Sequence, residues 1–79
     1  MSELREDLGR VIELMVDGPD QVEVEEVRQG SSTSLELSVA EQDLGKVIGR
    51  QGRTARALRT VLASRAAKES GEIELKVLD

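Results

Sequence analysis

The sequence predicts a small α+β domain in which a mixed three-stranded sheet is covered on one face by three helices. Three segments alternate apolar and polar residues with the period of a strand, and three others place apolar residues at helical spacing. Each strand pattern has a single apolar face, so the helices should pack together on that side of the sheet. The length suits one domain over residues 1–79. The expected order is helix, strand, strand, helix, helix, strand.

The N-terminal segment is predicted to be an amphipathic helix. The run Asp17-Gly18-Pro19-Asp20 should end it, because glycine favours helix termini and proline does not continue a helix. The apolar residues that recur on one face of this helix are Leu4, Leu8, Val11, Ile12 and Met15.

Two strands joined by a turn at residues 29–32 should follow as an antiparallel hairpin. In the first strand, Val22 and Val24 alternate with acids, and the change of phase before Val27 suggests a bulge at Glu25-Glu26. The apolar residues of the second strand are Leu35, Leu37 and Val39. The acids that should coat the outer surface of the sheet are Glu23, Glu25, Glu26, Glu36, Glu72 and Glu74.

Two helices are predicted between the second and third strands. The first begins at Glu41, runs for about two turns and ends at Gly49. The second begins near Arg53 and ends at Ser70-Gly71. Its expected buried stripe consists of Ala55, Leu58, Val61, Leu62 and Ala66, and its opposite face carries Arg53, Arg56 and Arg59.

The last strand is predicted from the alternation of Ile73, Leu75 and Val77 with charged residues. The crossover through two helices would return this strand parallel to the second strand if the two are neighbours.

The composition excludes several classes of site. The chain has no Phe, Tyr or Trp, so its core must be aliphatic and no aromatic side chain can stack on a base. It has neither Cys nor His, which argues against a disulfide, a zinc site or a nucleophile-imidazole pair. We therefore expect no enzymatic activity and no cofactor. The absence of a secretory signal and of a long apolar run predicts a cytoplasmic protein with no membrane contact.

Charge is segregated along the chain. Residues 40–68 hold seven of the eleven Lys and Arg but two of the sixteen acids, a net charge of +5, and the remaining residues have a net charge of −10. In the basic segment, Ile48-Gly49-Arg50-Gln51-Gly52 places two glycines three apart between the two helices. Glycines let the backbone approach a phosphate, and the N–H groups that begin the next helix favour an anion. Glycines that only cap one helix and begin the next would fit the same spacing.

The run from Gly45 to Arg59 resembles the core of a KH domain, in which an Ile-Gly-x-x-Gly loop joins two helices. Val47-Ile48 before the loop and Arg53-Thr54-Ala55 after it make the match specific, because Gly-x-x-Gly alone is common. An additional helix and strand precede this core, so the chain resembles a type II KH domain, the bacterial arrangement. Its size and the run from Lys46 to Leu62 are similar to the small bacterial RNA-binding proteins of the KhpA family.

This resemblance implies that the loop from Gly49 to Gly52 lies against the backbone of single-stranded RNA, with about four nucleotides in the adjoining groove. It implies a non-enzymatic RNA-binding protein of weak sequence specificity, acting as an RNA chaperone or post-transcriptional regulator. Arg59 is left out of the predicted site, because a solvated helix face accounts for it. The predicted RNA-binding residues are Lys46, Val47, Ile48, Gly49, Arg50, Gln51, Gly52, Arg53 and Arg56.

The resemblance also implies a homodimer and association with a larger KH-containing partner. Two weak sites joined in a dimer would gain apparent affinity through their linkage. A second function fits the same sequence: a protein-interaction module that keeps the KH scaffold and binds a protein through its acidic sheet face or its long helix.

Overall fold

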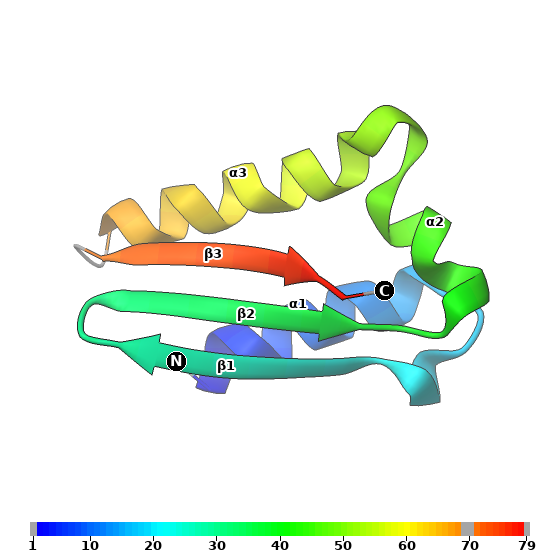
Figure 1. Cartoon of the computed structure of the whole chain (residues 1–79), viewed down its shortest axis with the longest axis horizontal. Helices are drawn as coiled ribbons and strands as arrows, with labels where there is room; N and C mark the ends of the chain where they lie inside the picture. The colour runs from blue at the N-terminus through cyan, green and yellow to red at the C-terminus, as the bar shows by residue number, and fades with distance from the viewer. Residues whose placement is uncertain (1, 69–70, 79) are drawn as a thin grey trace.

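The structure is a computed structural model that describes residues 2–68 and 71–78. Its three strands form one sheet in the order β1-β2-β3, in which β1 is antiparallel and β3 is parallel to the central strand β2 (Figure 1). The predicted hairpin and the parallel return of the last strand are confirmed. The elements are α1 (Ser2–Met15), the 3₁₀ turn η1 (Pro19–Gln21), β1 (Glu23–Gln29), β2 (Ser32–Ser38), the 3₁₀ turn η2 (Glu41–Asp43), α2 (Leu44–Ile48), the 3₁₀ turn η3 (Arg50–Gly52), α3 (Arg53–Lys68) and β3 (Glu72–Val77).

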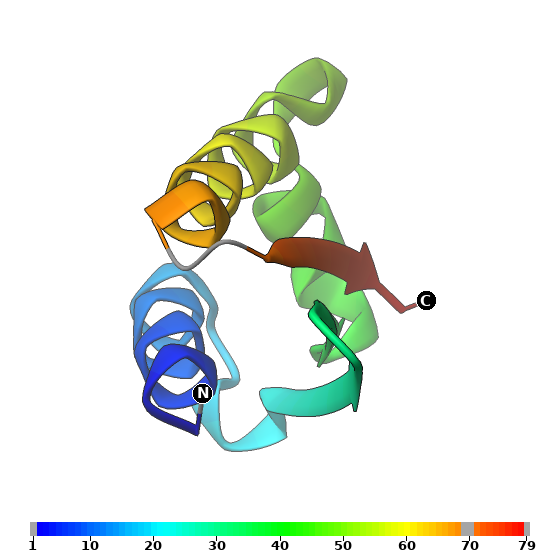
Figure 2. The same cartoon turned by 90° about the vertical axis from the view of Figure 1, so that its left-hand side faces the viewer.

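The helices cover one face of the sheet, and within the described ranges no helix lies on the other face (Figure 2). Helix α1 packs on β1, α3 packs on β3, and α2 contacts α3. The largest fully buried apolar side chains are Ile12, Leu35, Leu37 and Val47. Both leucines belong to β2, and burying each side chain contributes about 1.5–3 kcal/mol. In residues 2–68 and 71–78, no helix has the length and apolar character needed to cross a membrane.

The hairpin pairs without a bulge. Every residue of β1 opposes one residue of β2, and the pair next to the turn is Gln29 and Ser32. The two turn residues begin with Gly30, whose φ of +61° suits glycine. Because side chains alternate along a strand, Val27 lies on the outer face, 45% exposed, and Glu26 opposes Leu35 on the helix side. The predicted bulge and the predicted outer position of Glu26 are therefore wrong.

The open face of the sheet is acidic. Ser32 Oγ donates to Glu72 Oε1 at 3.2 Å, and Ser34 Oγ donates to Glu74 Oε1 at 3.4 Å, so polar contacts cross from β2 to β3. By alternation from these pairs, the carboxylates on this face are Glu23, Glu25, Glu36, Glu72 and Glu74.

Helix α3 buries a narrower stripe than its sequence predicts. Ala55, Leu62 and Ala66 are buried as expected, but Val61 is 66% exposed. The helix lies over the edge strand β3, so the sheet covers only one side of it (Figure 1). The predicted burial of Val61 is therefore wrong, and the predicted helix end at Ser70 lies outside the described residues.

The register of the hairpin is tested by two matched substitutions. Val27→Thr should change the free energy of unfolding by less than about 0.5 kcal/mol, because its side chain lies on the open face. Val24→Thr, which places a hydroxyl on the helix side, should cost roughly 1 kcal/mol or more. Urea denaturation measures both. A cost for Val27→Thr equal to that of Val24→Thr would contradict the register.

Candidate nucleic-acid interface

Gly49 joins α2 to the following turn in a conformation that suits only glycine. Its φ is 79° and its ψ is 170°. A Cβ added there would lie 2.7 Å from Thr54 Cβ and 2.8 Å from Thr54 N. The Gly49 N–H donates to Gly45 O at 2.8 Å, and its carbonyl accepts from Gly52 N at 3.1 Å. The missing side chain therefore lets the end of α2 meet the first turn of α3.

The second half of the loop is held by two arginines of α3. Gln51 has left-handed dihedrals, φ 57° and ψ 25°, which are uncommon for a residue with a side chain. Arg56 Nη2 donates to the Gln51 carbonyl, and Arg53 Nη2 donates to Gln51 Oε1 at 3.4 Å. Gly52 also has a positive φ, 74°. The two side chains thus brace an otherwise unfavourable backbone conformation.

The remaining predicted residues fall in different environments. Arg50 is exposed at the loop, and no hydrogen bond or ion pair of its side chain is found among the described residues. Ile48 is 38% exposed, whereas Val47 is fully buried in the core and has no side-chain surface to offer a ligand. Six predicted residues gather at the loop: Gly49, Arg50, Gln51, Gly52, Arg53 and Arg56.

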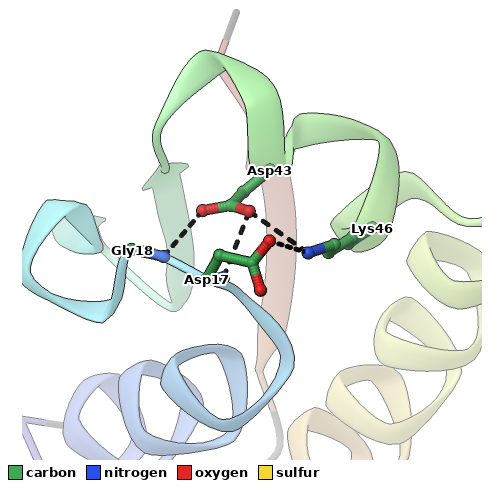
Figure 3. Close-up of polar contacts among 4 residues, drawn as sticks. All are labelled: Asp17, Gly18, Asp43 and Lys46. Atoms are coloured by element: carbon green, nitrogen blue, oxygen red, sulfur yellow. Dashed lines mark hydrogen bonds and ion pairs between the residues drawn. The ribbon is translucent and has the colours of Figure 1, made fainter.

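Lys46 is paired with two carboxylates (Figure 3). Its Nζ pairs with Asp17 and lies 3.6 Å from Asp43 Oδ1. Asp43 is fully buried and accepts hydrogen bonds from the backbone N–H groups of Asp17 at 3.1 Å and Gly18 at 3.0 Å. This cluster ties the segment after α1 to the start of α2. In the part of the chain that the structure describes, no group of three or more acids could hold a metal ion.

Asp43 and Lys46 are both charged at neutral pH. Burial raises the pKa of Asp43, but the hydrogen bonds from Asp17 and Gly18 and the charge of Lys46 outweigh it and lower the pKa below 3.8. The hydrogen bond to Asp17 is the main reason that the pKa of Lys46 is raised above 10.5. The positive charge of Lys46 is therefore largely compensated by the carboxylates of Asp17 and Asp43.

A groove of about 1050 Å³ lies between α3 and β3. Its α3 wall consists of Arg59, Ala63, Ala66 and Ala67, and the rest of its lining comes from residues 71–77 and from residues 32–34 of β2. Arg59 follows Arg56 by one helical turn, so the groove begins close to the loop. Arg59 was not among the binding residues predicted from the sequence. The small side chains of Ala63, Ala66 and Ala67 could have indicated a recessed surface on α3. The groove itself forms only when α3 packs on β3, which the sequence does not show.

A strand-helix-helix-strand core whose two helices are joined by a glycine turn, preceded by the additional helix α1 and the additional strand β1, defines a type II KH domain. The chain belongs to the KhpA/KhpB family: the family model described as "KhpA/KhpB, KH domain" matches residues 5–77.

Relatives in several bacteria support this assignment. The chain is 45% identical over 71 residues to the RNA-binding protein KhpA of Clostridium acetobutylicum, covering 90% of this chain and 95% of that protein. It is 49% identical over 65 residues to the RNA-binding protein KhpA of Halalkalibacterium halodurans, covering 82% and 86% of the two chains. The RNA-binding protein KhpA of Chlamydia pneumoniae is 38% identical over 76 residues, covering 96% and 97%.

Replacing Gly49 should destabilise the fold. Gly49→Ala forces a side chain into a glycine-only conformation, at a cost of about 1–3 kcal/mol before the contact with Thr54 is relieved. Gly45→Ala is the matched control: a Cβ there meets nothing within 4 Å, so this helical substitution should stabilise by roughly 0.5–1 kcal/mol. Urea denaturation measures both. Wild-type stability of Gly49→Ala would contradict the loop geometry.

The contacts of Asp43 with Asp17, Gly18 and Lys46 should make the free energy of unfolding depend on pH. A carboxyl whose pKa is lowered in the folded state stabilises it above the unfolded pKa of 3.8, and this contribution is lost as pH falls through the folded value. Asp43→Asn should therefore lower the urea midpoint at pH 7, and the gap to wild type should shrink below pH 3.8. Asp20→Asn, which removes an exposed carboxylate, is the control. A constant gap from neutral to acidic pH would contradict the contact.

Proposed function

We propose that the chain, as a single KH domain over residues 1–79, is a non-enzymatic protein that binds the backbone of single-stranded RNA at the loop Gly49–Gly52. The observation that carries the proposal is the convergence of Arg53 and Arg56 on Gln51, which fixes a glycine loop inside the basic segment. The relatives described above, each named an RNA-binding protein, support the same class of ligand.

A phosphate fits the loop for three physical reasons. Gly49 and Gly52 have no side chains to hold it away from the backbone. Helix α3 begins at Arg53, so its first N–H groups and the positive end of its dipole favour an anion beside the loop. Arg50 belongs to the same loop and adds an exposed positive charge. These contacts bind phosphate without reading sequence.

The bases of the bound strand would lie toward the groove between α3 and β3. The partly exposed side chain of Ile48 offers an aliphatic contact near the loop. Without an aromatic residue, the groove holds bases by apolar contact and hydrogen bonds only, so sequence preference should be weak. A broad, weak binder suits an RNA chaperone or post-transcriptional regulator in the cytoplasm. The homodimer and the larger KH-containing partner implied by the resemblance remain predictions.

Reversing the charge of the loop tests the proposal. Arg50→Asp with Gln51→Asp should weaken binding of a labelled single-stranded RNA roughly tenfold or more, because two carboxylates would face the phosphates. Asp accepts left-handed dihedrals, so the loop conformation should survive. Fluorescence anisotropy over a salt series measures both affinity and the salt slope, which should be about −0.7 per neutralised phosphate for wild type.

The chain contains a matched control for this variant. Arg28→Asp with Gln29→Asp changes the same residue types, both exposed, at the end of β1, and should weaken binding much less. The oligomeric state is measured in the same buffers, because linkage of two sites would raise apparent affinity. Equal binding by the loop variant and wild type would reject the loop as the RNA site and favour a protein-interaction module.

A further inference from the structure

The open face of the sheet ends in an apolar side chain just after β3. Side chains alternate along each strand, so Ser38 of β2 lies on this face. The N–H of Leu78 donates to Leu37 O at 2.8 Å, so Leu78 continues the alternation of Glu74 and Lys76 on the same face. Its side chain is 45% exposed. A leucine is thus available beside Ser38 at this end of the sheet.

A pocket of about 310 Å³ lies at the same end. Its lining consists of Ser38, Val39, Glu41, Leu44 and Leu78. The lining is mostly aliphatic and contains one carboxylate, so the pocket suits an apolar group with a cation beside it. Its volume is at the small end of the range for ligand pockets, which fits a single side chain.

The acids that border this pocket repel one another. Glu25 opposes Glu36 across β1 and β2, and like charges in this arrangement destabilise a sheet. Glu23 lies two residues before Glu25 on the same face and opposes Ser38, so three carboxylates extend to the pocket. In the part of the chain that the structure describes, these three and Glu41 have no hydrogen-bond or ion-pair partner. A cationic ligand would neutralise them and remove the repulsion.

The charge of the molecule indicates where such a ligand comes from. RNA is a polyanion, so these carboxylates repel it. Two copies of this chain also repel each other, since each has a net charge of −5. A basic segment of a different protein has the complementary charge, and one aliphatic residue in that segment would fill the pocket.

We propose that this end of the open face is a docking site for a basic protein segment, which places an aliphatic side chain in the pocket and lysine or arginine over Glu23, Glu25 and Glu36. The site lies on the side of the sheet away from the helices (Figure 2), whereas the glycine loop joins two of those helices. A protein partner and RNA would therefore occupy separate surfaces, and the inference does not depend on RNA binding.

Two labelled synthetic peptides test the docking site in fluorescence anisotropy: KRKLKRK carries an aliphatic anchor, and KRKSKRK lacks it. Wild-type protein should bind KRKLKRK roughly tenfold more tightly, because the leucine side chain leaves water for the pocket. Both affinities should fall as salt is added, because the carboxylates are exposed.

Leu78→Ser tests the pocket. The variant should bind KRKLKRK and KRKSKRK with affinities within about twofold of each other, because the apolar wall is lost, and its affinity for KRKSKRK should match that of wild type. Leu14→Ser, which replaces an 88% exposed leucine of α1, is the matched control and should keep the full preference.

Glu23→Gln with Glu25→Gln tests the carboxylates. This variant should bind both peptides about fivefold more weakly, because two ion pairs are lost. Its urea midpoint should not fall, because the repulsion between Glu25 and Glu36 is also removed. Glu6→Gln with Glu13→Gln removes the same charge from exposed positions of α1 and should weaken binding less than about twofold. Loss of affinity without loss of stability separates docking from a structural role.

The contrary outcomes are distinct. Absence of KRKLKRK binding, or equal affinities of wild-type protein for the two peptides, overturns the proposal. Equal weakening by the two glutamine pairs also overturns it, because net charge alone would then attract the peptides. Self-association of wild-type protein that Glu23→Gln with Glu25→Gln abolishes would identify a second copy as the occupant and overturn the proposed partner. RNA binding is unaffected by any of these results, because the glycine loop and α3 are unchanged.

Discussion

At Gly49 the backbone of α2 meets the first turn of α3 with no space for a side chain, and the site depends on this contact. The residue two positions before it, Val47, and the residue next to Thr54, Ala55, are both buried, so the junction is fixed to the core from each side. The direction of α3 follows from this junction. Because α3 then lies over β3, the same glycine determines both the loop and the groove beside the sheet edge.

The basic residues near the loop fall into two groups that differ in whether their partners are neutral or negatively charged. Arg53 and Arg56 contact Gln51 through neutral oxygen atoms, so they brace the loop and keep their full positive charge. Lys46 pairs with carboxylates, so its charge is largely compensated. A loop already held in shape loses less conformational entropy when a ligand binds, which favours affinity even for a small contact surface.

The element order, the one-sided sheet and the parallel return could be predicted, because they follow from periodicity and from the handful of ways in which such elements connect. The exposed position of Val27 could not be predicted from the sequence. The two-residue turn fixes the register of the hairpin, and the local alternation of apolar and polar residues does not reveal that register. The pairing of Lys46 with Asp17 and the contact of Arg59 with Leu75 join residues far apart in the chain. The glycine loop was found because its chemistry is local, whereas the groove exists only after α3 packs on β3.

The acidic open face of the sheet has a consequence for the way in which any polyanion meets this protein. With a basic segment of +5 and a remainder of −10, the molecule carries a strong electric dipole despite its modest net charge. A polyanion approaching the open face of the sheet is repelled, and one approaching α2, the glycine loop and α3 is attracted, over roughly one Debye length of 8–10 Å. Diffusional encounters are thus oriented before any atom touches. A negatively charged protein can in this way select the productive collision with a negatively charged ligand.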